Sequence, residues 1–392
     1  MASRTITSAG LNLPTHQVTS FGSDELRHET VIIPSTSQVA FGSYSVKEKG
    51  LLLHDVALNF NVSAISGLNG SVTNYPNFSP AFFWFTRIEI VINNNVIDTL
   101  YPSQQFIQNQ LFNSDEKRRL VNNAAGAYDS LAQRNAMAII TSNYYVDLWT
   151  LFQQTNLPLL WSKDDVQVRV YMDTLPNIVN QSSLTGTPVA TLNYANLVMK
   201  VSRLPHDLLY MRRDQIVQNA EQTKFHELRY GTFTVQSGVT ASTLVLTPLV
   251  GLVAFLYFTV RPPAALTGNS EYMHTAISNY AILDNTSTNI TGGQAIPSAL
   301  SLTILNKEWI DSTYTAETAL GIVNNGANVY LYSFSADPST AAKSGASYGA
   351  HRFMGNEQLQ ITFTGSLAAN VQVDVYAKCE ALIEQTNYYT KN

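Results

Sequence analysis

The chain has almost no cysteine. Cys379 is the only one among 392 residues, so an intramolecular disulfide and a thiolate metal cluster are both excluded. Nothing near Cys379 marks it as an activated nucleophile, and we expect a small buried residue at this position. Because disulfides belong to oxidising compartments, the composition favours a reducing one.

Charge is also scarce. Charged residues make up 13 % of the chain, about half of the usual share, so the polar surface comes mainly from Asn, Gln, Ser and Thr. Few ions then need to be desolvated when an interface closes, which favours an obligate assembly of copies over a freely diffusing monomer. The net charge of −5 argues against a basic face for phosphate contacts. The basic clusters at residues 117–119 and 212–213 are too short to alter this, and we expect no specific nucleic-acid partner.

Long hydrophobic stretches are missing as well. The first thirty residues contain no basic segment followed by an apolar core, and no stretch reaches the roughly eighteen apolar residues of a membrane span. The longest apolar run, residues 249–260, includes Gly251, Tyr257 and Thr259, and it predicts a buried strand. We therefore expect a protein that is not secreted through a signal peptide. The sequence leaves open whether a membrane underlies an assembly of it.

No catalytic motif is present. The seven histidines form no pair at the i, i+4 spacing of a helical zinc motif, and a Walker loop, a Gly-X-Ser-X-Gly elbow and a dinucleotide fingerprint are all missing. The sequence does not exclude a glycosidase carboxylate pair assembled by the fold. On alternating strands, however, acids are ordinarily solvated or ion-paired, and this is what we expect of Glu89, Asp98, Asp147, Asp173, Asp374 and Glu380. We predict no catalytic, cofactor-binding or metal-binding residue.

Residues 79–98 form the stretch around which we expect the fold to be organised. Isoleucines at 88, 90 and 92 alternate with other residues, and the asparagines at 93–95 interrupt a β-branched run that resumes at Val96. Alternation at period two is typical of a half-buried strand, and Asn tolerates the positive φ of a tight turn. The pattern predicts a hairpin. The consecutive aromatics Phe82–Phe85 are expected to start its central strand.

Short strands separated by turns are expected along the rest of the chain. They lie at residues 31–34, 51–62, 166–172, 196–203, 231–235, 243–246, 252–260, 276–285, 359–363 and 370–377. The aromatic-rich segments 144–149 and 157–161 are expected to form strands or turns. Helices are expected at 103–112, capped by Ser103, from a capped start at Ser114, and at about 204–223, where a domain junction is expected.

The second half repeats the strand order of the first at a period of roughly two hundred residues. Strands 243–246 and 252–260 take the places of 31–33 and 51–62, and 276–285 takes the place of the hairpin. Strands 359–363 and 370–377 correspond to 166–170 and 196–201. This order predicts an all-β fold of two β-sandwiches in tandem. We expect an N-terminal arm at 1–30, a first domain at 31–204, a helical linker at 205–225 and a second domain at 226–392.

Several of these segments resemble a known family. Residues 83–90, 96–102, 105–111 and 114–118 are similar to the first half of the double jelly-roll major capsid proteins, in the lineage of polinton-like viruses, virophages and adenovirus hexon. Residues 252–262 and 356–376 are similar to its second half. The resemblance extends over about residues 30–385 and rests on strand patterns.

The resemblance implies two eight-stranded jelly rolls side by side, with a few short helices in the connections. It further implies a structural protein without catalytic residues, whose homotrimers are pseudo-hexagonal capsomers that tile an icosahedral virion shell. Its partners would be neighbouring capsomers, penton and minor capsid proteins, and it would be assembled into virions inside the host cell. The arm at 1–30 is expected to reach under neighbouring capsomers.

The alternative belongs to another class, a two-domain jelly-roll glycan-binding protein or glycan-cleaving enzyme. It requires a cleft lined by exposed aromatics and two carboxylates, and the twenty tyrosines keep it open.

Overall fold

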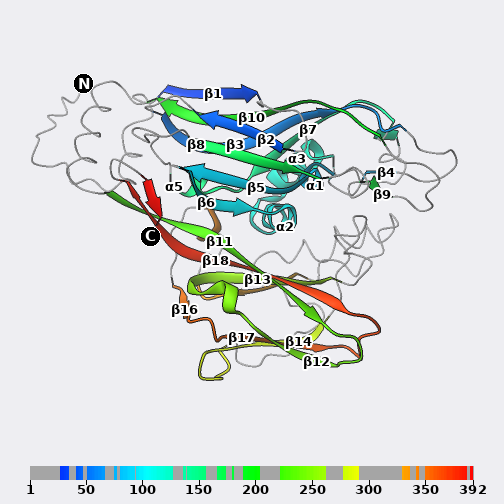
Figure 1. Cartoon of the computed structure of the whole chain (residues 1–392), viewed down its shortest axis with the longest axis vertical. Coiled ribbons are helices and arrows are strands. Elements are labelled where there is room, and N and C mark those ends of the chain that lie inside the picture. The colour runs from blue at the N-terminus through cyan, green and yellow to red at the C-terminus, as the bar shows by residue number, and fades with distance from the viewer. Residues whose placement is uncertain are drawn as a thin grey trace, which may run out of the picture.

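The computed structural model describes much of the chain. The described residues are 27–34, 41–46, 51–66, 75–76, 80–92, 94–126, 136–137, 139–155, 166–173, 179–180, 189–203, 221–261, 277–290, 329–335, 341–343, 349–385 and 389–391. Within these ranges the chain builds two antiparallel β-sandwiches, one after the other (Figure 1). None of the helices described is long and apolar enough to cross a membrane.

The first sandwich has two four-stranded sheets. Sheet I has the order β1-β10-β3-β7 and sheet II the order β2-β8-β5-β6. The chain enters sheet I, passes to sheet II and returns repeatedly, which is the winding of an eight-stranded jelly roll. The strands are β1 (Arg27–Pro34), β2 (Phe41–Val46), β3 (Leu51–Val62), β5 (Phe85–Ile92), β6 (Asn95–Leu100), β7 (Ser142–Leu148), β8 (Val166–Met172) and β10 (Leu192–Arg203). A separate two-stranded ribbon joins β4 (Tyr75–Pro76) to β9 (Val179–Asn180).

The second sandwich repeats this arrangement. Sheet III has the order β11-β18-β13-β15, with β16 and β19 on its margins, and sheet IV has the order β12-β17-β14. Seven strands thus match the first jelly roll in order, and the counterpart of β6 is not among the described residues. The strands are β11 (Glu221–Val235), β12 (Ala241–Val245), β13 (Gly251–Arg261), β14 (Ile277–Leu283), β15 (Val329–Ser333), β16 (His351–Phe353), β17 (Gln358–Phe363), β18 (Val371–Gln385) and β19 (Tyr389–Lys391). A short 3-10 helix, η3 (Thr247–Leu249), precedes β13.

The strand positions confirm the expected tandem order with one correction. Strands β13, β14, β17 and β18 stand where β3, β5, β8 and β10 stand in the first jelly roll. Residues 243–246, however, lie in β12, which corresponds to β2 and not to β1. The counterpart of β1 is β11, because β11 pairs with β18 as β1 pairs with β10.

The organising hairpin is confirmed, and its start is corrected. Strands β5 and β6 pair from Ile88–Leu100 to Ile92–Asn95, and Asn94 takes the positive φ of 63° that the turn requires. Strand β5 lies between β8 and β6, inside sheet II. The aromatic run does not enter it as one strand: α1 (Pro80–Phe83) is a short helix and β5 begins at Phe85. Proline favours the first position of a helix, and Phe82 packs its ring against Phe106, 5.9 Å away.

The helices between β6 and β8 are more numerous than expected. Helix α2 (Pro102–Phe112) has Tyr101 at its N-cap, not Ser103, because Pro102 occupies the first helical position. Helix α3 (Asp115–Ala124) begins as expected at Ser114, whose Oγ accepts the amide of Lys117. Helix α5 (Leu151–Thr155) was not expected.

The expected helical linker is wrong at its C-terminal end. Residues 221–225 begin β11, which pairs with β18 along its whole length, from Glu221–Gln385 to Val235–Val371. This long pairing satisfies the backbone groups that a helix would satisfy internally. Residues 205–220 of the linker lie outside the described residues, as does the arm up to residue 26. Strand β1 already begins at Arg27, inside the expected arm.

Candidate functional site at the junction of the two jelly rolls

The outer face of sheet III is covered by the first jelly roll. Phe255 and Tyr257 of β13 and Tyr376 of β18 are fully buried and belong to the same apolar cluster as the core of the first jelly roll. The alternate residues of β13, such as Leu256 and Phe258, face sheet IV in a second cluster. Figure 1 shows sheet III between the first jelly roll and sheet IV. Strand β13 is therefore buried on both faces, which explains the long apolar run of residues 249–260.

Three tyrosines form a row across sheet III. Tyr376 lies opposite Tyr230 of β11 and Tyr257 of β13, with ring centroids 4.9 and 5.1 Å away and planes within 25° of parallel. The Tyr230 hydroxyl donates to Asp374 at 2.7 Å, and the Tyr376 hydroxyl shares a hydrogen bond of 2.5 Å with Ser103 of α2. Burial raises the pKa of Tyr376, so it stays neutral. The row joins the second jelly roll to the start of α2.

Helix α2 carries buried amide side chains into the junction. Gln105 binds both backbone groups of Trp149: its Oε1 accepts the Trp149 amide at 2.7 Å and its Nε2 donates to the Trp149 carbonyl at 3.2 Å. The Asn109 side chain donates to the Gln105 carbonyl at 2.8 Å, and Asn113 donates to Asn109 at 2.8 Å. Buried polar groups that are satisfied in this way fix the orientation of an element. The amides thus hold α2 against the segment that follows β7.

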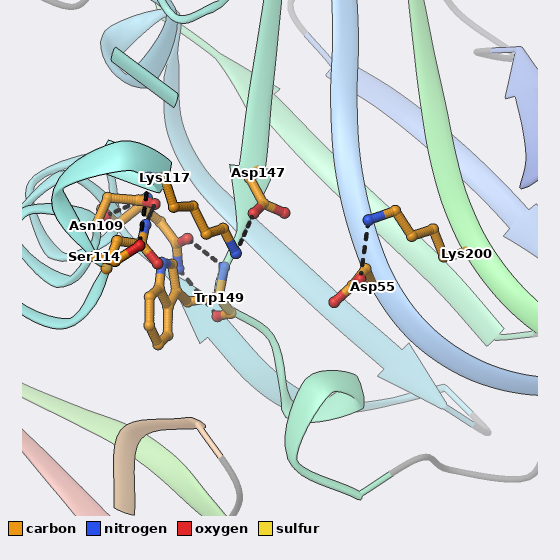
Figure 2. Close-up of polar contacts among 9 residues, drawn as sticks. Asp55, Asn109, Ser114, Lys117, Asp147, Trp149 and Lys200 are labelled. Carbon is orange, nitrogen blue, oxygen red and sulfur yellow. Dashed lines mark hydrogen bonds and ion pairs between the residues drawn. The ribbon is translucent and has the colours of Figure 1, made fainter. Parts of the chain in front are cut away.

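Helix α3 is tied to sheet I by an ion pair. Lys117 Nζ lies 3.2 Å from Asp147 Oδ2 of β7, as Figure 2 shows beside Asn109 and Trp149. Burial raises the pKa of the Asp147 carboxyl, and the Lys117 charge opposes this shift. The contact fixes α3 over the end of β7 that leads into the junction.

A second group of polar residues at the junction is ionisable. Lys378 of β18 is buried and donates to the His226 carbonyl at 3.5 Å. Burial lowers the pKa of Lys378, and the nearby charge of Asp98 on β6 opposes this shift. Burial, together with the Lys378 charge, lowers the pKa of His226 to about 4, so its ring is neutral at pH 7. Gln154 of α5 accepts the His226 amide at 2.7 Å and so links the jelly rolls a second time.

The acids singled out in the sequence do not converge on one cleft within the described residues. Glu89 pairs with Arg87 at 2.9 Å on sheet II, and Asp147 pairs with Lys117. Asp374 pairs with Arg261 on sheet III. These three are ion-paired, as expected. Of the others, Asp98 lies at the junction, Glu380 lies on β18 and Asp173 follows β8.

Cys379 lies in the core between sheets III and IV, which confirms the expected buried residue. Burial raises the pKa of its thiol to about 12, so the thiolate that reacts is scarce. His54 hydrogen-bonds Ser202 at 2.6 Å. Among the residues that the structure describes, no three His, Cys, Asp or Glu gather as metal ligands.

Sequence reasoning missed the residues that make the junction. Gln105, His226 and Lys378 were not singled out, although a lysine inside the largely apolar stretch 371–381 was an available signal. The amides of α2 gave no comparable signal, because a helix with Gln and Asn on its surface is ordinarily solvent-exposed.

No protein-family model and no curated protein matches the chain. Solved structures do match it over nearly its whole length. VP54 of the virus PBCV-1 has 14 % identity and a TM-score of 0.66, over 93 % of this chain and 97 % of that one. The Faustovirus major capsid protein has 9 % identity and a TM-score of 0.66, over 92 % and 91 %. The mavirus major capsid protein has 9 % identity and a TM-score of 0.52, over 93 % and 90 %. At these identities the likeness shows the fold, and the chain has the double jelly-roll fold of these capsid proteins.

Proposed function

We propose that this chain is a major capsid protein, three copies of which form a pseudo-hexagonal capsomer of an icosahedral virion shell. Its role is structural, and no residue is assigned a catalytic function. Its partners are copies of itself, neighbouring capsomers, and penton and minor capsid proteins. In this proposal the first jelly roll ends near residue 204, the second begins with β11, and the arm reaches under the neighbouring capsomers.

The observation that carries the proposal is the buried junction between two jelly rolls of one strand order. The second sandwich packs on the first through a buried part of sheet III, and the aromatic row and the α2 amides hold the two in a defined orientation. One such chain presents two similar walls, so a threefold arrangement presents six. A six-sided unit fills a surface, which is what a shell requires.

The glycan alternative loses its main support. It needs exposed aromatics along a cleft with two carboxylates, whereas Tyr230, Tyr257 and Tyr376 are stacked at the junction and Tyr44 lies in the core of the first jelly roll. Tyr145 and Tyr194 are exposed on sheet I, and the acids of the described residues do not converge on one cleft beside them. No observation favours glycan binding or hydrolysis over the capsomer.

The native mass of the purified full-length chain tests the proposal. Light scattering should give about 130 kDa, three times the 43.2 kDa of one chain, and negative-stain microscopy should show a six-sided outline. A chain that stays monomeric at every concentration at which it is soluble contradicts the proposal. The arm is tested separately: a chain without residues 1–26 should still form trimers but not shells, and unchanged shell assembly would refute the role of the arm.

A further inference from the structure

Sheets I and III occupy the same place in their jelly rolls, yet within the described ranges only sheet III is covered by the other jelly roll. We propose that the outer face of sheet I is an interface, and that it receives the second jelly roll of another copy of this chain. The first jelly roll covers sheet III in the same way. This inference rests on the proposed capsomer and names the surface through which its ring closes.

A shared irregularity aligns the two sheets residue by residue. In sheet I, Lys200 pairs with Asp55 and the next residue pairs with Leu53, so His54 is an extra residue on β3. In sheet III, Lys378 pairs with Phe255 and the next residue pairs with Val253, so Ala254 is an extra residue on β13. Both bulges lie on the third strand of a jelly roll and directly beside a lysine of the last. Lys200 is therefore the counterpart of Lys378.

The alignment extends across both sheets as one row of outward-facing residues. In sheet III the row crosses β11, β18, β13 and β15 and consists of Tyr230, Tyr376, Tyr257 and Leu331. These residues lie on the face that packs against the first jelly roll. In sheet I the corresponding row crosses β1, β10, β3 and β7: Ile32, Val198, Ala57 and Asp147.

The two faces have different cover in the single chain. The side chain of Ile32 is 60 % exposed and Val198 is half-buried, whereas their counterparts pack against the core of the first jelly roll: Tyr230 is partly buried there and Tyr376 is fully buried. The side chain of Lys200 is 64 % exposed and pairs with Asp55 at 3.3 Å (Figure 2), whereas Lys378 is buried. Sheet I thus presents Ile32 and part of Val198 to the outside, beside the ion pair of Lys200 and Asp55. At the β7 end of the row, Asp147 pairs with Lys117 of α3.

At one end of this face lies a group of neutral side chains. Asn61 donates to Asn143 at 2.5 Å and accepts from Asn193 at 2.6 Å, and the Tyr194 hydroxyl donates to Asn143 at 3.1 Å. Neutral amides that already satisfy one another lose less solvation on burial than charges do. Such a face suits a permanent interface better than a solvated surface.

A second copy is the occupant because of the symmetry of the arrangement. Sheet III of the second jelly roll is covered by the first jelly roll of the same chain. If each jelly roll in the ring contacts the next in the same way, sheet I of the first jelly roll is covered by the second jelly roll of a neighbouring chain. This contact joins two different surfaces, and such heterologous contacts close into rings when the rotation between units allows it. Three chains with two jelly rolls each supply six equivalent contacts in the ring.

Arginine substitution on the face tests the interface. Ile32→Arg with Val198→Arg places two charges in the proposed contact, and we expect the trimer fraction measured by light scattering to fall at least tenfold at equal concentration. The matched control is Val245→Arg on β12 of sheet IV, where Val245 is 45 % exposed and lies outside the face. The control should form trimers as the unchanged chain does. Circular dichroism and thermal melting establish that each variant folds.

Maleimide labelling gives a second readout that needs no disassembly. In one chain, Ile32 is more exposed than Val245, so Ile32→Cys should label at least as fast as Val245→Cys if sheet I is free. Burial in the interface predicts labelling at least tenfold slower at position 32. The native Cys379 is buried and adds little signal.

The outcomes separate the two proposals. If the unchanged chain is trimeric, but the arginine variant is also trimeric and position 32 labels freely, the interface on sheet I is refuted and the capsomer stands. If the unchanged chain is monomeric, the capsomer fails and this inference fails with it. Trimers lost in the arginine variant alone, together with protection at position 32, support the interface.

Discussion

Acidification should loosen the junction through His226. This side chain is fully buried, and neither ring nitrogen has a hydrogen-bond partner among the described residues. Burial and the Lys378 charge lower its pKa from 6.5 to about 4. Between these values the unfolded chain binds a proton at this ring that the folded chain does not bind. The free energy of unfolding therefore falls as the pH falls from 6.5 towards 4.

The size of the effect follows from the shift. At 1.36 kcal/mol per pKa unit, the change from 6.5 to about 4 corresponds to about 3 kcal/mol of stability lost across this window. His226→Gln keeps a polar side chain but cannot titrate. We therefore expect the free energy of unfolding of the unchanged chain to fall by about 3 kcal/mol more than that of His226→Gln over the same pH range.

Urea unfolding measures this difference. Trp149 lies at the junction beside Gln105, so it is one of four tryptophans whose fluorescence follows unfolding, and it lies in the region that should open. The protein concentration is kept constant, because the stability of an oligomer depends on it. His351→Gln is the matched control, since His351 lies on β16 and stacks on Phe334. Equal pH dependence in the unchanged chain and in His226→Gln would refute the reasoning.

Three further predictions concern single positions. Gln105→Leu leaves both backbone groups of Trp149 without their partner, so its free energy of unfolding in urea should fall by about 2–6 kcal/mol. The control Gln360→Leu, on the exposed face of β17, should change it by less than about 0.5 kcal/mol, and equal losses contradict the role of Gln105. Asn94→Val should lower the free energy of unfolding by about 1–2 kcal/mol in the same assay, because valine is strained at positive φ. Asn94→Gly should leave it near that of the unchanged chain. Equal stability of the two variants would argue against the turn. Cys379 should resist a thiol reagent at pH 8 in the folded chain and react in urea, since its thiol is buried with a pKa of about 12, and rapid labelling of the folded chain would disprove its burial.

The elements that the sequence predicted well are those whose signal is local. Alternation at residues 166–172 and the β-branched run on both sides of Asn94 specify a strand and a hairpin through side-chain period and turn chemistry alone. The apolar run 249–260 likewise predicted a buried strand, because a stretch without alternation leaves no solvated face. The repeated order of strands could also be predicted, because each strand carries its own local pattern in the sequence.

The junction was decided by contacts between residues far apart in the chain. The sequence alone favoured a strand at Phe82, but Phe82 lies in helix α1 and packs its ring against Phe106 of α2. It favoured a helix up to residue 225, but pairing with β18, more than a hundred residues later, made a strand.

The burial of Lys378 and His226 has the same origin. Alternation along a strand assigns a residue to one face of its sheet but does not say what covers that face. Sheet III carries these residues on a face that the first jelly roll covers, while Lys200 occupies the equivalent place on sheet I and remains largely exposed in the single chain. The sequence determined the two sandwiches and the order of their strands. Only the tertiary structure decided which sheet face is buried within the chain, because burial depends on the packing of one jelly roll against the other.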